Sequence, residues 1–262
     1  MPNSPIVSVL MTAFNREQYI AEAIESVLKS SFNNFELIVV DDCSGDRTFE
    51  ISESYGKKDS RVRVYQNEKN LGDYPNRNKA ASYSTGKYIK YLDSDDIMYP
   101  HCLEVMVTAM ERFPEAGFGL SAAGDPNHPY PIVINPHAAY LEHFHGFGHF
   151  DRAPGSSIIL KKAFDFVGGF SGKRMIGDYE LWFKLGRYYP LVKFPIDLYW
   201  ARTHENQESK SDYALDYVNL RDKVLKEALV HEDCPLNEQE KTIVEKKTIR
   251  ELIKNKISKY FL

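Results

Sequence analysis

The sequence predicts an α/β protein with an open, mostly parallel sheet that is covered by helices on both faces. Three observations lead to this prediction. In the first hundred residues, short apolar runs alternate with segments whose apolar residues recur at helical spacing. The apolar runs are continuous and rich in β-branched residues, as in strands that are buried on both faces. Polar and acidic residues follow these runs directly, where open α/β sheets bind ligands.

The predicted elements of this first part alternate strictly. Residues 6–11 (IVSVLM) form the first predicted strand, and the apolar residues Ile20, Ile24, Val27 and Leu28 then share one helix face within residues 16–30. Further strands are predicted at 35–42, 61–67 and 87–93, and further helices at 45–55 and around 76–83. This is the order of consecutive βαβ units.

The alternation is less regular after this part. Pro100 suits a first helical turn, and one apolar helix face follows it at Leu103, Met106, Val107 and Met110. Residues 117–155 lack clear periodicity, and the aromatic and glycine residues at 137–150 predict a mobile loop that contacts an acceptor. A helix at 179–189, strands at 191–195 and 198–202, and helical structure from Ser211 to the end complete the prediction.

Composition and charge exclude several classes of function. The formal net charge of −4 argues against nucleic acid as the main partner. The three cysteines lie far apart and form no C-x-x-C pair, which disfavours a disulfide framework or a cysteine zinc site. The first residues lack the basic region of a signal peptide, and no apolar stretch approaches the ~20 residues that span a bilayer. We therefore expect a cytoplasmic protein, with peripheral contact at the inner face of a membrane left open.

The segment LDSDD (92–96) places three carboxylates within four positions at the end of a predicted strand. Like charges this close repel, so a cation is expected beside them. Mg²⁺ or Mn²⁺ is commonly held by one or two carboxylates and by substrate phosphates, which predicts a phosphorylated substrate. The alternative is a helix start capped by Ser94, Asp95 and Asp96. Asp41 and Asp42, at the end of a neighbouring predicted strand, favour the metal site.

Three ordered segments resemble family 2 glycosyltransferases, which have a GT-A fold. They are residues 7–48 (beginning VSVLMTAFNREQYI), 70–100 (including NLGDYPNRNKAA and YLDSDD) and 168–185 (GGFSGKRMIGDYELWFKL), within a resemblance that covers about residues 6–205. The resemblance implies a Rossmann-like open mixed sheet flanked by helices. It also implies inverting transfer of a sugar from a nucleotide-diphosphosugar to a glycan or lipid-linked acceptor.

The resemblance divides the chain into two regions. Residues 1–210 are expected to form the GT-A domain, with a nucleotide-sugar-binding half at 1–96 and an acceptor-binding half at 97–210. Residues 211–262 are expected to form a helical C-terminal extension.

The resemblance also implies roles for the polar residues beyond the strand ends. Asp42 would accept a hydrogen bond from the base, most simply a uracil N–H, and Asp93 would contact the ribose or a metal-bound water. Asp95 would bind the metal cofactor, Mn²⁺ or Mg²⁺, directly. The residues expected around the nucleotide are Thr12, Ala13, Phe14, Asn15, Asp41, Asp42, Asn76, Arg77, Asp93 and Ser94.

An Arg-x-His pattern at 202–204 resembles a family feature near the metal and the diphosphate. It implies that His204 joins Asp95 and Asp93 as a metal ligand, and that Arg202 neutralises phosphate charge. A structural loop histidine is the alternative.

On the acceptor side, the resemblance implies that Asp178 in IGDYEL is the general base. A carboxylate there can take the proton of the attacking hydroxyl. Family members often carry an acidic pair at this place, whereas this chain has Gly177 first. Asp178 is therefore the expected base, and Glu180 is the weaker candidate. The alternative role of Asp178 is to cap the helix that follows.

The tail at 236–262 carries an apolar stripe from Ile249 to Phe261 and a net positive charge. Such a stripe is expected to pack against the domain or to form a homodimer. Contact with an anionic membrane surface is the alternative.

Two other functions remain open, whereas oxidoreductases and P-loop enzymes are disfavoured because their glycine motifs are absent. A sugar nucleotidyltransferase would carry a glycine-rich basic loop where this chain has TAFNREQ. A non-catalytic nucleotide-sugar-binding module would not need Asp95 and Asp178.

Overall fold

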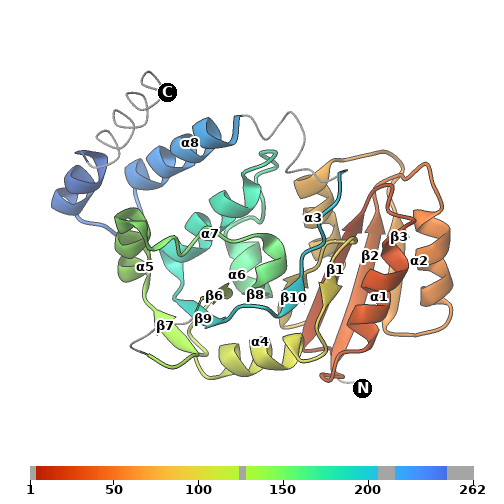
Figure 1. The fold of residues 1–262 in the computed structure, drawn as a ribbon. Helices are drawn as coiled ribbons and strands as arrows, with labels where there is room; N and C mark the ends of the chain where they lie inside the picture. Colours follow the sequence, from red (N-terminus) through yellow and green to blue (C-terminus); the bar gives the residue numbers. More distant parts are fainter. Residues whose placement is uncertain (1–3, 124–127, 206–215, 247–262) are drawn as a thin grey trace.

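The structure, a computed structural model, describes residues 4–123, 128–205 and 216–246. Figure 1 shows one large sheet with helices packed on both of its faces. The sheet has eight strands in the order β3-β2-β1-β4-β8-β6-β9-β7, and a small second sheet pairs β10 with β5. The expected α/β class with an open mixed sheet is confirmed.

The bounds of the elements are as follows. The strands are β1 (Val7–Ala13), β2 (Phe35–Asp41), β3 (Val62–Gln66), β4 (Tyr88–Tyr91), β5 (Ile97–Met98), β6 (Phe118–Ala122), β7 (Ile132–Ile134), β8 (Ser157–Leu160), β9 (Leu191–Pro195) and β10 (Tyr199–Trp200). The helices are α1 (Ile20–Leu28), α2 (Thr48–Gly56), α3 (Asp73–Ser82), α4 (Cys102–Glu111), α5 (Pro136–Glu142), α6 (Lys161–Phe166), α7 (Gly177–Tyr188) and α8 (Tyr217–Val230). A π-helical turn, η1 (His143–Phe147), follows α5, and a 3₁₀ turn, η2 (Pro154–Ser156), precedes β8.

The four strands β3, β2, β1 and β4 run parallel and form the half that the sequence predicts. β1 lies at its centre, because it pairs with β2 on one side and with β4 on the other. Every residue of β2 is buried, which explains the unbroken apolar run of this strand. The helices α1, α2 and α3 connect successive strands, as predicted, with ends that differ from the prediction by a few residues.

Each face of the sheet has its own hydrophobic core. On one face, the strands pack against α3, α5, α6, α7 and α8. On the other face, they pack against α1 and α4, with α2 at the edge. Successive residues of a strand point to opposite faces, so Ile89 and Tyr91 enter the first core and Tyr88 enters the second.

The second half of the sheet reverses strand direction. β8 runs antiparallel to both β4 and β6, β9 runs parallel to β6, and β7 closes the edge antiparallel to β9. The sequence pattern did not predict β6, β7, β8, α5 or α6. β6 carries Gly119 and Ser121, which weaken a strand signal. The glycine serves packing here, because a Cβ atom at Gly119 would lie 2.6 Å from the Phe194 ring.

The prediction of a mobile acceptor loop at 137–150 is wrong. Residues up to Glu142 belong to α5, and η1 follows directly. Tyr140 and Phe150 are fully buried, and the Tyr140 hydroxyl donates to the carbonyl oxygen of Phe183 at 2.7 Å. Tyr140 and Phe150 therefore belong to the core, whereas Phe147 of the same segment is 71% exposed.

The expected helix from Ser211 to the end is interrupted in the described residues. α8 ends at Val230, and helical structure resumes at 238–246. Asn237 begins this second helix, because Glu240 N donates to Asn237 Oδ1 while Asn237 N donates to Glu240 Oε2, both at 3.0 Å. The apolar stripe from Ile249 to Phe261 lies outside the described residues.

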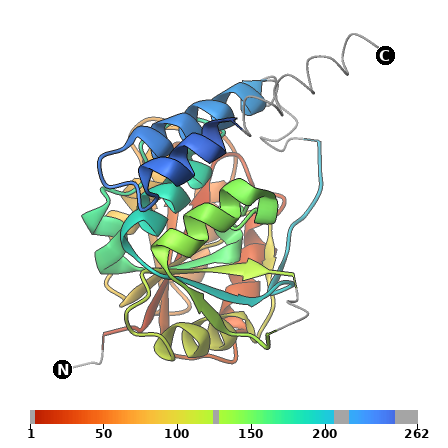
Figure 2. The same ribbon diagram turned by 90° about the vertical axis from the view of Figure 1, so that its left-hand side faces the viewer.

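The described part of the extension packs on the domain. Val224, Ala228 and Leu229 of α8 are buried in the core that contains α7. Figures 1 and 2 show α8 and the short helix after it lying over α5 and α7. In the parts of the chain that the structure describes, no helix combines the length and apolar character needed to cross a membrane.

A buried carboxylate ties the amino ends of the parallel strands together. Glu36 of β2 accepts hydrogen bonds from the Ser8 hydroxyl at 2.6 Å and from Thr85 N at 2.8 Å. Arg63 Nη1 lies 2.8 Å from the other carboxylate oxygen. Burial raises the pKa of Glu36, but the hydrogen bonds outweigh it and hold the pKa below the ordinary value of 4.5. This interaction joins β1, β2, β3 and the approach to β4.

We predict that Glu36→Ala lowers the free energy of unfolding by about 2 kcal/mol at pH 7, because buried donors lose their acceptor. Since the folded pKa is lowered, the stabilisation by Glu36 is complete above pH 4.5 and is lost as the pH falls through the folded pKa. Urea unfolding at a series of pH values measures both effects. Glu53→Ala, in an exposed pair with Lys57, is the control. An equal loss in both variants would contradict the prediction.

Candidate active site

The carboxyl ends of β1, β2 and β4 meet at one edge of the sheet. Ala13 and Asp41 are paired in register, and Asp42 N donates to Ala13 O at 2.7 Å. On the other side of β1, Leu92 N donates to Leu10 O at 3.0 Å. This pairing brings together Thr12 at the end of β1, the acidic pair after β2 and the D-x-D segment after β4. The sequence predicted this gathering from strand direction alone.

The loop after β1 is tied to the loop after β2. Asn15 has a positive φ of 54°, which asparagine tolerates better than most residues. Its backbone N–H donates to Ser44 Oγ, and its side-chain oxygen accepts from Gly45 N, both at 2.9 Å. Ser44 N in turn donates to Asp41 Oδ2 at 3.0 Å. Buried Asp41 thus supports the loop, while Phe14 stays 44% exposed beside it.

Asp42 is 3% exposed and holds the segment that leads into α3. One carboxylate oxygen accepts from Asn67 Nδ2 at 2.7 Å and from Leu71 N at 2.9 Å. The other accepts from Gly72 N at 2.9 Å. Carboxylate oxygens offer about four acceptor positions in total, so one more donor can be bound here.

Asn76 uses its amide inside the protein. Its oxygen accepts from Asn67 Nδ2 at 2.9 Å, and its nitrogen donates to Val40 O at 3.2 Å. With 2% of its surface exposed, Asn76 anchors α3 to β2.

Arg77 is the buried cation at this edge. Its Nε donates to Asp73 and its Nη2 donates to Asp93, both at 2.7 Å. Burial raises the pKa of Asp93, but the charge and hydrogen bond of Arg77 outweigh it and lower that pKa overall. Arg77 Nη1 is buried and has no hydrogen-bond partner among the residues the structure describes. An oxygen atom of a ligand would satisfy this donor.

Asp95 lies between two nitrogen donors. Its Oδ2 is 3.1 Å from Arg16 Nε and 3.0 Å from His204 Nε2. The His204 ring stacks on Tyr19, with ring centres 4.8 Å apart. The side chains of Asp95 and His204 are only 13% and 10% exposed, so both are held in place. The structure therefore brings together Asp95 and His204, which are 109 positions apart in the chain.

Arg202 reaches the same segment through both its backbone and its side chain. Its N–H donates to Asp96 Oδ1 at 3.0 Å, and its Nε donates to Asp95 O at 2.9 Å. Its Nη2 also pairs with Glu22 at 2.5 Å. Burial and the neighbouring charge of Asp93 raise the pKa of Asp96 to about 7. Ser94, between these carboxylates, is 4% exposed.

The side chains of Asp95 and His204 fit a metal ion whose remaining coordination positions are filled by a substrate. In the described ranges, no group of three or more His, Cys, Asp or Glu side chains lies close enough together to hold a metal ion. Asp95 and His204 do form an oxygen and nitrogen pair, 3.0 Å apart. Mg²⁺ and Mn²⁺ sites with few protein ligands rely on substrate phosphates for the rest.

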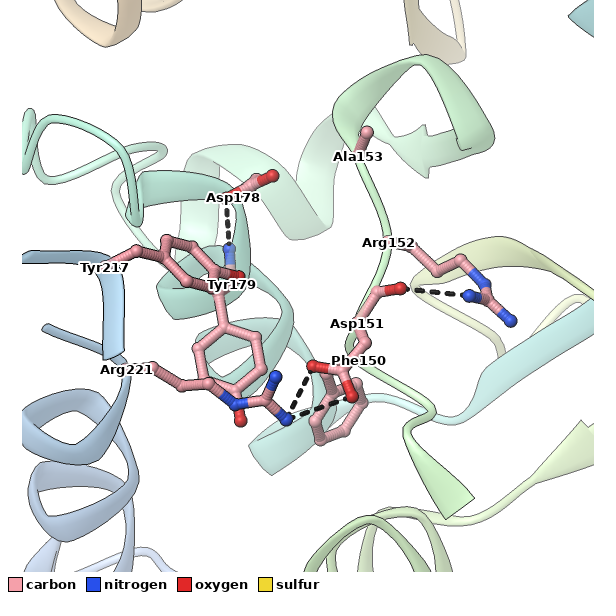
Figure 3. Close-up of a pocket in the computed structure, with 8 residues that line it drawn as sticks. All are labelled: Phe150, Asp151, Arg152, Ala153, Asp178, Tyr179, Tyr217 and Arg221. Carbon is pink, nitrogen blue, oxygen red and sulfur yellow. Dashed lines mark hydrogen bonds and ion pairs between the residues drawn. The ribbon is translucent and has the colours of Figure 1, made fainter. Parts of the chain in front are cut away.

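Asp178 lies in the first turn of α7, at the wall of a cavity of about 270 Å³ (Figure 3). Its Oδ1 accepts from Tyr179 N at 2.8 Å and from the Tyr74 hydroxyl at 3.1 Å. Burial raises the pKa of Asp178 to about 6, although both hydrogen bonds lower it. A carboxylate with this pKa is ionised at neutral pH and still basic enough to accept a proton.

The alternative capping role of Asp178 has little support in the geometry. The residue that precedes the helix is Ile176, and no side chain caps it. Asp178 instead accepts the N–H of its direct neighbour and faces the cavity.

Glu180 is engaged elsewhere. Its Oε1 pairs with Lys173 Nζ at 2.6 Å, and its other oxygen accepts from the Ser171 hydroxyl. Lys173 also pairs with Glu227 of α8 at 2.8 Å. Glu180 therefore links α7 to α8, whereas Asp178 lines the cavity.

Sequence reasoning missed several residues of the site. Arg16 directly follows the predicted segment Thr12–Asn15, so its position was a usable signal. Tyr74 carries no such signal, because only the packing of α3 against α7 brings its hydroxyl to Asp178. Asp151 and Arg221 are likewise 70 positions apart and meet only in the folded chain.

A sequence model of the family described as "Glycosyl transferase family 2" matches residues 8–174. An uncharacterized glycosyltransferase of Haemophilus influenzae is 28% identical over 229 residues, which cover 80% of this chain and 69% of the relative. The putative teichuronic acid biosynthesis glycosyltransferase TuaG of Bacillus subtilis is 40% identical over 122 residues, which cover 45% of this chain and 48% of the relative.

WfgD of Escherichia coli, a UDP-Glc:alpha-D-GlcNAc-diphosphoundecaprenol beta-1,3-glucosyltransferase, is 41% identical over 106 residues. This match covers 40% of the present chain and 41% of WfgD. The matches to TuaG and WfgD therefore span less than half the length of those relatives.

Solved structures share the fold. TarS of S. aureus, residues 1–349 in complex with UDP-GlcNAc, superposes with a TM-score of 0.72 at 22% identity and covers 91% of this chain and 70% of that chain. Mannosyltransferase PcManGT of Pyrobaculum calidifontis, in complex with GDP-Man and Mn²⁺, gives a TM-score of 0.62 at 12% identity and covers 100% of this chain and 82% of that chain. These likenesses confirm the GT-A fold. Because the family model spans well over half of the sequence, the chain belongs to glycosyl transferase family 2.

Proposed function

We propose that the protein is an inverting, metal-dependent glycosyltransferase that moves a sugar from a nucleotide-diphosphosugar to a hydroxyl of a glycan or lipid-linked glycan. The observation that carries the proposal is the environment of Asp178. Its carboxylate, with a pKa of about 6, lines a cavity and receives a hydrogen bond from Tyr74 of α3. The same helix carries Arg77, which binds Asp93 of the D-x-D segment. Helix α3 thus contacts both Asp178, the expected base, and the D-x-D segment, where the diphosphate would bind.

The nucleotide would lie across the carboxyl ends of β1, β2 and β4. The segment Thr12–Asn15 would border the base, and Asp42 would accept a base N–H at its remaining acceptor position. We favour uridine as the nucleoside, since a uracil N–H meets a carboxylate most simply. A UDP-GlcNAc complex of TarS supports this choice by analogy of fold alone. Arg77 Nη1 would donate to an oxygen of the ligand.

Asp95 and His204, together with phosphate oxygens of the substrate, would hold Mn²⁺ or Mg²⁺. Asp93, which pairs with Arg77 in this structure, is the expected third ligand. When bound, the ion stabilises the negative charge that develops on the departing diphosphate. Arg202 would add a fixed positive charge beside the same segment, because its guanidinium is held against the Asp95 carbonyl oxygen.

The acceptor hydroxyl would react beside Asp178. Its proton passes to the carboxylate as the hydroxyl oxygen forms a bond to the anomeric carbon. The bond from that carbon to the diphosphate oxygen breaks on the opposite side, and the diphosphate leaves with the electron pair. Attack from the side opposite to the leaving group inverts the anomeric configuration.

The choice of acceptor rests on relatives. The names of TuaG and WfgD refer to teichuronic acid and to a diphosphoundecaprenol-linked sugar. A polysaccharide or its lipid-linked precursor is therefore the acceptor class that we propose, with reaction at the inner face of a membrane.

We predict that chelation of divalent cations abolishes transfer and that Mn²⁺ or Mg²⁺ restores it. Asp95→Asn should lower the rate of transfer about 100-fold or more, because a group that stabilises the leaving diphosphate is weakened. Release of nucleoside diphosphate measures the rate. Asp59→Asn, in a surface pair with Arg61, is the control. Full turnover in the chelated enzyme would exclude the metal-dependent scheme.

We predict that kcat/KM falls as the pH decreases through about 6, because protonated Asp178 cannot accept a proton. Tyr74→Phe removes a hydrogen bond that lowers this pKa, so the acidic limb of the pH profile should move to higher pH. Tyr83→Phe at the end of the same helix should leave the pH profile unchanged.

Asp178→Asn should lower the rate of transfer by about 10²–10⁴-fold with donor binding intact. Transfer at the wild-type rate in Asp178→Asn would remove the assignment.

We predict that uridine diphosphosugars raise the melting temperature more than guanosine or adenosine diphosphosugars in the presence of Mn²⁺, because a bound ligand stabilises the folded state. Equal shifts with all three bases would contradict the proposed role of Asp42.

The reaction products separate the rival functions. A transferase releases nucleoside diphosphate, a nucleotidyltransferase releases or consumes pyrophosphate, and a binding module releases neither.

A further inference from the structure

The cavity beside Asp178 is completed by the C-terminal extension. Tyr217 and Arg221 of α8 line it together with Asp151, Asp178 and Tyr179 (Figure 3). α8 lies beyond the segment that the family model matches, which ends at residue 174. The wall facing Asp178 therefore comes from the C-terminal extension, outside the segment that the family model matches.

A chain of contacts holds the wall in place. Phe150 N donates to His143 Nδ1 at 3.1 Å, so the proton of the neutral ring is on Nε2, which lies 2.8 Å from the Tyr179 hydroxyl. Burial, together with the positive charge of Arg221, lowers the pKa of His143 to about 3 and keeps the ring neutral. The Arg221 guanidinium lies over the Tyr179 ring at 4.9 Å. The aromatic wall is thus preorganised.

The charges that line the cavity are largely balanced. Arg221 Nη2 lies 2.8 Å from one oxygen of Asp151 and 3.0 Å from the other. The Arg152 side chain donates to Ser121 O at 2.7 Å, and Figure 3 shows its guanidinium directed away from Asp178. The Arg221–Asp151 pair therefore offers no net charge to a ligand, and the nearby Asp178 carboxylate disfavours a negatively charged ligand group. Carboxylate acceptors and phenol rings suit the hydroxyls and the apolar faces of an uncharged sugar.

The size of the cavity points to a single sugar ring. Its volume of about 270 Å³ lies just below the ~300–1,000 Å³ of sites for drug-sized ligands. Tyr217 is partly buried and lines the cavity together with Asp178. Burial and the charge of that carboxylate both raise the pKa of the Tyr217 hydroxyl. Figure 3 shows the Tyr217 ring next to Asp178 on the extension side of the cavity.

We infer that α8 completes a binding subsite for one uncharged monosaccharide unit, in which Tyr217 packs against the sugar ring and Asp151, held by Arg221, accepts its hydroxyl groups. This inference rests on the proposed function in one respect: the bound unit is the part of the acceptor that presents its hydroxyl to Asp178. The extension thereby selects the acceptor, while the family core binds the donor.

The test measures binding of methyl glycosides of glucose, galactose, mannose and N-acetylglucosamine to the full chain, by saturation-transfer NMR and calorimetry without donor. At least one glycoside should bind the wild type. Tyr217→Ala should weaken that binding about tenfold, as expected for the loss of one aromatic contact. Tyr217→Phe should retain it. Asp151→Asn should also weaken it, because a neutral amide is a poorer hydroxyl acceptor.

Val218→Ala is the matched control, because Val218 is adjacent on α8 and 71% exposed. Thermal unfolding of each variant shows whether the fold is intact. Binding of no glycoside to the wild type, or equal affinity in Tyr217→Ala and the wild type, would overturn the inference.

The design separates this inference from the proposed function. Asp95→Asn should still bind the glycoside, because binding in this cavity does not require the donor site. Glycoside binding without transfer from any donor would refute the proposed function alone. Transfer with an unchanged acceptor KM in Tyr217→Ala would refute the subsite alone.

Discussion

The site depends on the neutralisation of carboxylates that parallel strands bring to one edge. Asp93 is stabilised as an anion by buried Arg77, which also binds Asp73. Asp95 meets Arg16 and His204. Without such partners, these partly buried acids would be protonated or would repel one another. These partners arrive from three separate segments, so the edge forms only when the whole half-sheet is assembled.

The two ends of the parallel half use carboxylates for different purposes. At the amino ends, Glu36 is satisfied entirely by protein donors and joins neighbouring strands. At the carboxyl ends, Arg77 Nη1 has no hydrogen-bond partner among the residues that the structure describes. A buried polar network stabilises the fold when all of its donors and acceptors are hydrogen-bonded. A ligand site, in contrast, needs donors or acceptors that the protein itself leaves unused.

The carboxylate on the acceptor side, Asp178, is held by a different kind of partner. Burial raises the pKa of Asp178, and the partners that orient its carboxylate are the Tyr74 hydroxyl and the Tyr179 backbone N–H. α3 connects this region to the D-x-D edge, because Tyr74 and Arg77 lie on the same helix. α8 then covers the cavity with Tyr217 and Arg221, so the segment matched by the family model and the C-terminal extension meet at one cavity.

The sequence by itself determined the parallel half and its functional edge. Apolar runs followed by Asp42, Asp93 and Asp95 are local signals, and strand direction places their ends together. Tertiary structure alone decided the rest. The short strands β6 and β8 carry weak local patterns and are buried by long-range pairing, and β7 is a partly exposed edge strand that pairs with β9. The contacts of His204 with Asp95 and of Arg221 with Asp151 join residues far apart in the chain, and no local periodicity encodes such distances.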